Sequence, residues 1–249
     1  MRVALCVVGQ LLRLETTSKA TFLANHENVD AFLVLQATNR YSRNVSKATR
    51  SCAQTSVSKS HAETLHPVHT TWTSSSDAVL AAHLTSRLST KYTTTRYIEL
   101  HAYQYQNWRQ CALDVEEHEW KANITYDYVI RVRDNAIIMG DLLATLDQDH
   151  CTTKRCMSWG GLHDKVMTCP RRFMQPMLRD PVENLLFGSA RYETDTNTET
   201  TLERTLNSSN VPVRRIDWFP VQDARPCACN ATHLLKWCMS TKDCRPKPT

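Results

Sequence analysis

Tyr126-Asp127-Tyr128-Val129-Ile130-Arg131-Val132-Arg133-Asp134-Asn135 is the stretch that decides how this chain is expected to fold. Its first part has the β-branched and aromatic residues of a buried strand, which we predict over residues 128–132. Charged and amide side chains end the strand. Open α/β sheets bind ligands at the carboxyl ends of their strands. The polar cluster is therefore expected to lie in a ligand crevice.

The residue types of this cluster indicate the kind of ligand. Arg131 and Arg133 each offer a planar fork of N–H donors, which suits the oxygens of a diphosphate. Asp134 and Asn135 offer oxygens to a hard divalent cation such as Mg²⁺ or Mn²⁺, and that cation would bridge the same phosphates. Together they predict a nucleotide-sugar site.

Length and composition limit the class of protein. The 249 residues, 41% of them apolar, are enough for one large α/β domain. The formal charge of +5 favours anionic ligands, and the sequence contains no nucleic-acid-binding motif. The longest apolar stretch, residues 3–9, is too short to cross a bilayer. We expect no nucleic-acid partner and no transmembrane segment.

The order of apolar segments predicts an α/β fold, with a mixed, mostly parallel sheet flanked by helices. Strands over 3–8 and 29–35 with a helix over 11–23 form a β-α-β unit. A long amphipathic helix over 99–121 leads into the strand at 128–132. Further elements are expected as a strand and turn over 157–161, helices over 171–178, 181–187 and 198–206, and a strand over 211–219.

Two regions are expected along the chain. Residues 1–225 form the α/β domain, interrupted over about 37–95 by an irregular insertion rich in Ser, Thr, Asn and His. Within it, only residues 77–88 have the pattern of a short amphipathic helix. Residues 226–249 form a cysteine-rich tail.

The chain has ten cysteines, and their placement allows two interpretations. Four crowd the tail and three flank the middle of the chain: Cys227, Cys229, Cys238, Cys244, and Cys151, Cys156, Cys169. A disulfide-linked tail is typical of a secreted protein, whereas a zinc site is the alternative. Cys6, inside the first strand, is expected to be a small buried hydrophobic residue.

The cellular compartment also has two interpretations. N-glycosylation sequons at Asn44, Asn123, Asn207 and Asn230 favour a glycoprotein of the secretory pathway. If an amino-terminal anchor precedes the chain, we expect the Golgi lumen. A chain that begins at Met1 is instead expected in the cytoplasm, with its cysteines reduced.

Six short motifs follow one another over about residues 2–225. They are Gly9-Gln10-Leu11-Leu12-Arg13, Asp30-Ala31-Phe32, Tyr105-Gln106-Asn107-Trp108, the stretch 126–135, Gly160 to Lys165, and Glu199-Thr200-Thr201-Leu202. In this order they resemble a group of short GT-A-like glycosyltransferases of algae, viruses and other microbes. The resemblance implies a GT-A-like fold and transfer of a sugar from a nucleotide-diphosphate donor to a glycan or protein hydroxyl.

The resemblance also implies a metal site at the end of the central strand. Asn135 stands where the related enzymes have the last acid of a metal-binding motif, and an amide oxygen is a weaker ligand than a carboxylate. Three alternatives follow: Asp134 takes the role, the metal is bound loosely, or Arg131 and Arg133 replace its charge.

The remaining donor-binding candidates follow the first strand and the glycine turn. Gly9 permits a close approach of the nucleotide, and Gln10 and Arg13 are expected to contact it. Lys165 is expected to hold a donor phosphate or a sugar hydroxyl.

Two carboxylates are candidates for the catalytic base. Asp164 is the first, because its turn is expected across the crevice from Arg133. Glu199, at a helix start, is the second and is alternatively a ligand of the acceptor. Simpler structural roles remain open: ion pairs for Arg131 and Arg133, a turn cap for Asp164, and a capping box for Glu199.

A different functional class is also open. Because Asn135 replaces an acid, a catalytically degenerate GT-A-like protein that only binds a glycan or nucleotide is the alternative to the enzyme. A methyltransferase or a P-loop kinase is disfavoured, since no glycine-rich loop follows the first strand.

Overall fold

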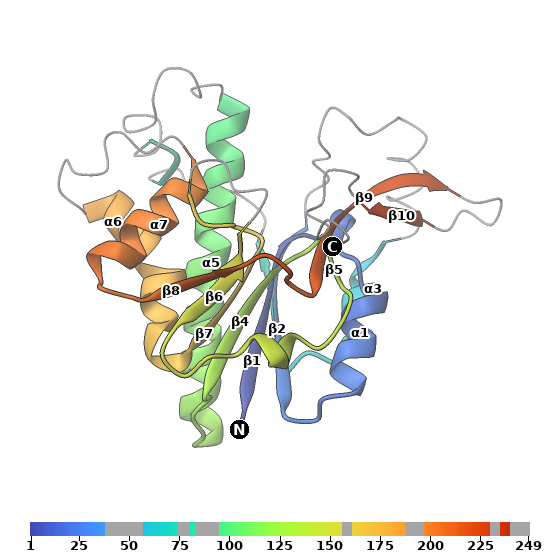
Figure 1. The fold of residues 1–249 in the computed structure, drawn as a ribbon. Helices are drawn as coiled ribbons and strands as arrows, with labels where there is room; N and C mark the ends of the chain where they lie inside the picture. The colour runs from blue at the N-terminus through green and yellow to red at the C-terminus, as the bar shows by residue number, and fades with distance from the viewer. Residues whose placement is uncertain are drawn as a thin grey trace, which may run out of the picture.

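The computed structural model describes residues 1–37, 57–73, 80–82, 95–155, 161–187, 197–229 and 235–239, of which 95–99, 224–229 and 235–239 are described by their backbone alone. A seven-stranded sheet forms the centre, with helices on both faces (Figure 1). No helix within these ranges is long and apolar enough to cross a membrane.

The central sheet is parallel at four of its six strand pairings. This confirms the predicted α/β class with a mostly parallel sheet. In order across the sheet the strands are β3 (His69–Thr73), β2 (Val29–Gln36), β1 (Val3–Gln10), β4 (Tyr128–Arg133), β7 (Val166–Pro170), β6 (Cys151–Lys154) and β8 (Val213–Ile216). β7 is antiparallel to both of its neighbours, β4 and β6.

Helices cover both faces, which explains why β1 is an uninterrupted apolar run. Alternate residues point to opposite layers: Cys6 lies in the core cluster that includes α5, and Leu5 in the cluster that includes α1. One layer has α5 (Thr95–Ala122), α6 (Asp180–Phe187) and α7 (Thr198–Ser208), and the other has α1 (Thr17–Ala24) and α3 (Lys59–Glu63).

A second, three-stranded sheet lies beside the first. Its strands are β5 (Ala136–Ile138), β9 (Val221–Cys229) and β10 (Leu235–Met239), in the order β10-β9-β5. The expected tail boundary at residue 226 therefore falls within β9. The tail cysteine side chains lie outside the described residues, so their disulfide or zinc role stays a prediction.

Several expected elements differ in the structure. The helix predicted over 11–23 is a short 3₁₀ turn at Leu11–Arg13, followed by α1. The helix over 171–178 is a 3₁₀ turn at Arg171–Phe173 followed by a π-helical turn at Gln175–Arg179. β6 was not expected, and a further 3₁₀ turn forms at Leu142–Thr145. The part of the insertion that the structure describes contains α3 and β3.

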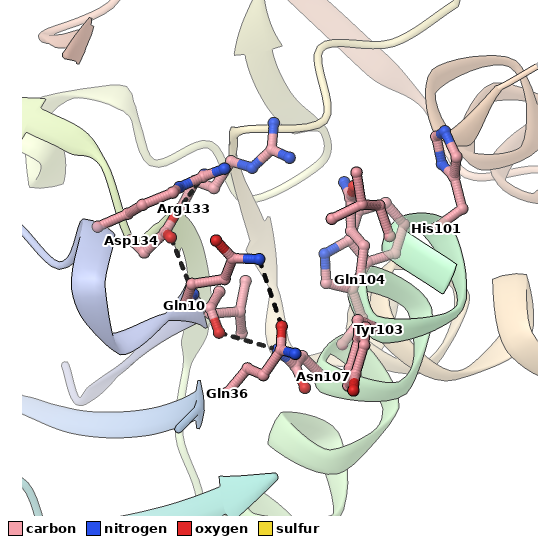
Figure 2. Close-up of a pocket in the computed structure, with 13 residues that line it drawn as sticks. Gln10, Gln36, His101, Tyr103, Gln104, Asn107, Arg133 and Asp134 are labelled. Carbon is pink, nitrogen blue, oxygen red and sulfur yellow. Dashed lines mark hydrogen bonds and ion pairs between the residues drawn. The ribbon is translucent and has the colours of Figure 1, made fainter. Parts of the chain in front are cut away.

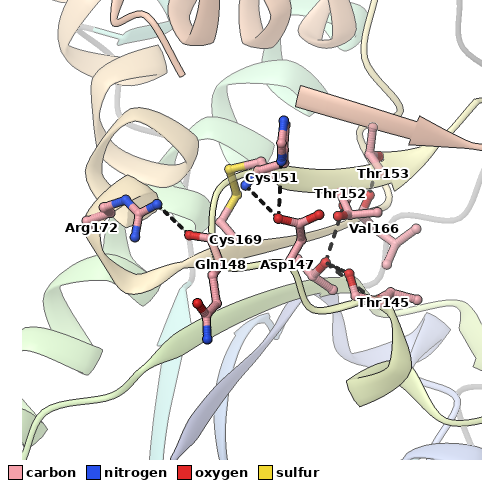
Figure 3. The surroundings of a disulfide bond; sticks show 11 residues. Thr145, Asp147, Gln148, Cys151, Thr152, Thr153, Val166, Cys169 and Arg172 are labelled. Carbon is pink, nitrogen blue, oxygen red and sulfur yellow. Dashed lines mark hydrogen bonds and ion pairs between the residues drawn. A yellow bond between two sulfur atoms is a disulfide. The ribbon is translucent and has the colours of Figure 1, made fainter. Parts of the chain in front are cut away.

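Within the described residues, two disulfide bonds join elements of the main domain. Cys6 on β1 is bonded to Cys111 on α5, so the prediction that Cys6 is only a buried hydrophobic residue was wrong. Both residues are completely buried, and apolar burial alone is compatible with either state. Cys151 and Cys169 link the neighbouring strands β6 and β7 (Figure 3).

Some sequence predictions fall outside the described ranges. These are Cys156, most of the expected strand over 157–161, most of the helix over 77–88, and the sequons at Asn44 and Asn230. The other two sequons, at Asn123 and Asn207, have exposed asparagines.

Candidate functional site

A pocket opens at the carboxyl ends of β1, β2 and β4, against the first half of α5. Figure 2 shows residues of the strand ends along one side and residues of α5 along the other. The strand side consists of Val8, Gly9, Gln10, Arg13, Gln36, Arg133 and Asp134, and the helix side of Leu100, His101, Tyr103, Gln104, Asn107 and Trp108.

Strand register brings the first group together. Gln10 pairs with Gln36 on β2, and Val8 pairs with Arg133 on β4, so three parallel strands end at one level. Asn107 of α5 then connects the helix to this edge, because its Nδ2 donates to the Gly9 carbonyl oxygen at 3.2 Å. The predicted crevice at this edge of the sheet therefore exists as a pocket.

Gly9 and Asp134 are in direct contact. Gly9 has a φ of +148°, and a Cβ added there would lie 2.3 Å from Cγ of Asp134. The space allows the backbone N–H of Gln10 to donate to Asp134 Oδ2 at 2.8 Å. Position 9 thus requires glycine because another group comes close to its backbone, as expected. The group that comes close is the Asp134 side chain, whereas the nucleotide had been expected.

Arg13 binds both residues that were expected to hold a metal. Its Nη2 donates to Asp134 Oδ1 at 2.7 Å and to Asn135 Oδ1 at 3.2 Å. Asp134 is 0% exposed, and its two oxygens accept from Arg13 and from the Gln10 backbone. A divalent cation would have to displace Arg13, so these two residues, held in this way, do not fit the metal that the resemblance implies.

Lys19 on α1 stabilises this arrangement, and it was not predicted from the sequence as a site residue. It is completely buried on α1, and its Nζ donates to the carbonyl oxygens of Glu15 at 2.8 Å and Asp134 at 3.2 Å. Burial lowers the pKa of Lys19 to about 8, while the charges of Glu15 and Asp134 act in the opposite direction. Lys19 fixes the backbone that carries Asp134.

Arg133 lies among carboxylates at the centre of the site. Its Nη1 is 3.6 Å from Asp164 Oδ2, and its backbone N–H donates to the Lys165 carbonyl oxygen at 2.8 Å. Burial disfavours the charge, but Asp164, Asp134, Asp223 and Glu199 together raise the pKa of Arg133 above its ordinary value. Arg133 therefore stays charged and lines the pocket.

Asp164 is only 7% exposed and has three partners. Gln104 Nε2 donates to its Oδ2 at 2.5 Å and Thr198 Oγ1 at 3.2 Å, beside Arg133. Burial opposes ionisation, but the Arg133 charge, the Gln104 hydrogen bond and Lys165 hold the pKa of Asp164 well below its usual range. Asp164 is thus an ionised carboxylate that orients Arg133.

Glu199 lies in the first turn of α7, next to the glycine turn. The backbone N–H of Leu162 donates to the Glu199 carbonyl oxygen at 3.1 Å, and a Cβ on Gly161 would lie 2.2 Å from the Glu199 backbone. The capping box of α7 is formed by Asn197 and Thr200, so the Glu199 side chain is not part of it. The two predicted catalytic carboxylates, Asp164 and Glu199, thus lie on two segments that pack against each other: the turn at residues 161–164 and the start of α7.

Arg131 and Lys165 are placed differently from the other predicted donor ligands. Arg131 is 0% exposed and its guanidinium stacks 4.0 Å from the Trp108 ring centroid. It therefore contacts a residue that lines the pocket without being a lining residue itself. Burial lowers the pKa of Arg131 to about 10, against the charge of Asp164. Lys165 forms an ion pair with Asp223 of β9.

Several residues of the site had not been proposed as site residues from the sequence. Gln104 and His101 lie three residues apart on α5, a spacing that places both on one helix face, yet polar residues on that face are also usual on solvated helices. Thr198 and Asp223 carried no detectable signal. Within the described residues, the group that could share a metal ion lies elsewhere: His69, Asp114 and Glu117.

Among known proteins, no family model and no curated protein matches this chain. Solved structures similar to this chain include the apo form of the glycosyltransferase GlyE from Streptococcus pneumoniae TIGR4, with a TM-score of 0.39, and a second GlyE structure, with 0.40. Each is 13% identical over 86% of this chain, which spans 45% of GlyE. Likeness of this degree identifies neither the reaction nor the ligand.

Proposed function

We propose that the protein transfers a sugar from a nucleotide-diphosphate donor to a hydroxyl of a glycan or protein. One observation carries the proposal: Arg13 and Arg133 line one pocket at the carboxyl ends of parallel strands, beside the backbone of Gly9 and Gln10. Guanidinium forks at the carboxyl ends of parallel strands suit a diphosphate. The Tyr103 ring and the Leu100 side chain line the pocket and supply apolar surface for a base or sugar ring.

In the proposed binding mode Arg13 contacts the diphosphate first. Its Nη2 is held by Asp134 and Asn135, while its Nε is buried without a hydrogen-bond partner among the described residues. A buried donor without a partner is costly, and a phosphate oxygen would satisfy it. Arg133 supplies the second positive charge to the leaving diphosphate.

Asp164 and Glu199 are proposed to have different roles in the transfer. A general base is most effective when its pKa is near the working pH, which the strongly acidic Asp164 does not meet. Asp164 is proposed to hold Arg133 against the leaving group and stays a candidate base. Glu199 is proposed as the carboxylate that receives the acceptor proton or grips the acceptor.

The proposed reaction does not rely on a metal at Asp134 and Asn135. Mn²⁺ or Mg²⁺ would supply positive charge to the leaving diphosphate, and these two residues would be its ligands only after Arg13 had moved. The functions assigned above to Arg13, Arg133 and the carboxylates are those of the chain's own residues.

Binding without turnover is the second candidate function, and a specific observation favours it. Arg133 and Asp164 are ion-paired, and Lys165 is paired with Asp223, so a diphosphate must compete with carboxylates for each cation. A protein with this balance of charge could hold a neutral glycan instead.

For localisation we propose the lumen of the secretory pathway, such as the Golgi. The disulfides Cys6–Cys111 and Cys151–Cys169 and the exposed sequon asparagines at Asn123 and Asn207 support this proposal, because disulfides persist in oxidising compartments.

A two-stage experiment tests the function. Nucleoside diphosphates and their sugars are first screened by thermal shift, since a ligand that binds the folded state raises the melting temperature. Donor hydrolysis and transfer are then measured on the wild type and on Asn135→Asp. Turnover by the wild type supports the enzyme, and turnover by Asn135→Asp alone supports the degenerate binder. If no nucleotide stabilises the protein, the donor site is wrong.

A further inference from the structure

A second polar cluster lies away from the pocket, between β3 and the carboxyl-terminal half of α5. It consists of His69, the first residue of β3, and of Asp114 and Glu117, three residues apart on α5. One ligand atom from each of these residues lies within 4.8 Å of the others. The cluster thus joins the edge strand of the sheet to the long helix.

Asp114 is unusual because it is a buried carboxylate without a strong cationic partner. It is 2% exposed. Its Oδ2 accepts from Thr71 Oγ1 at 2.9 Å and its Oδ1 from Gln110 Nε2 at 2.7 Å. The one ion pair it makes among the described residues is with His69, whose Nε2 is 3.5 Å from Oδ1. Buried charges are normally paired or coordinate metals, and in the part of the chain that the structure describes this carboxylate is paired with an imidazole alone.

We propose that His69, Asp114 and Glu117 bind a zinc-type divalent cation. With bonds of about 2.0–2.1 Å, a tetrahedral zinc ion separates neighbouring ligand atoms by about 3.3 Å. His69 and Asp114 are 3.5 Å apart and need almost no adjustment. Glu117 is half exposed and paired with Lys121. Its ligand atom lies within 4.8 Å of the other two, so it moves inward by up to about 1.5 Å, and water fills the fourth position.

The surroundings of Asp114 fit a metal ligand. Thr71 and Gln110 donate to its two oxygens and fix the orientation of the carboxylate, as partners of metal-bound carboxylates do. The ion neutralises the buried charge and fastens β3 to α5. Thr73 of the same strand donates to Asn107 at 3.3 Å, and Asn107 donates to Gly9. The cation therefore stabilises the contact of β3 with α5, the helix that lines one side of the pocket.

Calorimetric titration of the full chain with ZnCl₂, after dialysis against a chelator, tests the proposal. We expect His69→Ala and Glu117→Gln each to lower the affinity of one zinc site by at least about tenfold. Zinc bound by cysteines elsewhere is common to all variants and cancels in this comparison. Glu117 is exposed, so Glu117→Gln retains the fold, and melting curves in EDTA verify it for both variants.

His150→Ala is the matched control. His150 and Asp147 form another His–Asp pair, 3.1 Å apart, and no third ligand joins it among the residues that the structure describes. This substitution should leave zinc binding unchanged. The proposal is overturned if wild type, His69→Ala and Glu117→Gln bind zinc equally, or if His150→Ala loses as much affinity as His69→Ala. Nucleotide affinity is measured separately, so neither result depends on the proposed transfer reaction.

Discussion

Arg13 and Asp134 bind each other at 2.7 Å, although the sequence suggested that each would bind a different part of a metal–diphosphate ligand. The carboxylate is completely buried and the guanidinium is partly exposed to the pocket. The arginine thus occupies the place where a cation was expected, and it lines the pocket.

Arg13→Ala should weaken binding of the best nucleoside diphosphate by about tenfold to a hundredfold, because a charge-assisted hydrogen bond contributes about 1.5–3 kcal/mol. Isothermal titration measures the change. Arg214→Ala, which removes an exposed arginine on β8 that pairs with Asp147, should bind like the wild type. Equal affinity in Arg13→Ala and wild type would remove Arg13 from the donor site.

The same titration tests whether Arg13 or a metal ion supplies the positive charge beside Asp134 and Asn135. Mn²⁺ should add little to the wild-type affinity, since Arg13 already binds the oxygens of Asp134 and Asn135. In Arg13→Ala combined with Asn135→Asp, two carboxylates become available, and Mn²⁺ should restore nucleotide binding. Strong dependence of the wild type on Mn²⁺ would contradict this assignment.

Gly9→Ala should destabilise the fold by about 2–4 kcal/mol, since the new Cβ meets Asp134 and the backbone has a positive φ. Urea denaturation measures the free energy of unfolding. Gly140→Ala is the control: its Cβ would lie 3.3 Å from the Pro220 side chain and φ is not in the left-handed region. A Gly9→Ala variant as stable as wild type would show that Asp134 moves aside without cost.

Asp164→Asn should lower the transfer rate by more than tenfold, because Arg133 loses the carboxylate that orients it. Donor affinity should stay near the wild-type value. If Glu199 is the base, Glu199→Gln should lower the rate further and flatten the acid limb of the pH–rate profile. Full transfer by Asp164→Asn would show that this carboxylate has no part in the reaction.

His163 should make stability depend on pH. It is 2% exposed, its ring nitrogens have no hydrogen-bond partner among the described residues, and burial lowers its pKa to about 4. Asp223 and Asp164 oppose this shift, and Lys165 and Lys154 reinforce it. Between pH 6.5 and 4 the unfolded chain binds a proton that the folded one does not, so stability falls as pH falls, by up to roughly 3 kcal/mol.

Urea titrations at pH 7 and pH 5 check this expectation. His163→Gln should lose less stability between the two pH values than the wild type does, whereas the partly exposed His150→Gln should follow the wild type. An identical pH dependence in all three proteins would assign the effect to other groups.

The two described disulfides should stabilise the fold to different degrees. Cys6–Cys111 closes a loop with a sequence separation of 105, and Cys151–Cys169 one of 18. Loop-closure entropy predicts losses of about 4.7 and about 3 kcal/mol when each pair is replaced by alanines. Denaturation of the two double variants measures the losses, and a larger loss for the shorter loop would contradict the entropic account.

The pattern of apolar residues was sufficient to predict the central strands and the long helix. β1 is a continuous apolar run and β2 and β4 are mainly apolar, because both faces of the sheet are covered, and α5 carries a helical stripe. β6, Cys-Thr-Thr-Lys, and β3, His-Thr-Thr-Trp-Thr, lack such a pattern. They become strands by pairing with β7 and β2, which depends on residues distant in sequence.

For the site, the sequence by itself determined which edge of the sheet carries Gly9, Arg13, Arg133 and Asp134, because the carboxyl ends of neighbouring parallel strands meet. Only the tertiary structure decided their partners. Arg13 reaches Asp134 across 121 residues, and Arg131 stacks on Trp108 because α5 crosses that face of β4. Such pairings depend on distances of a few ångströms between separate elements, which local sequence periodicity does not encode.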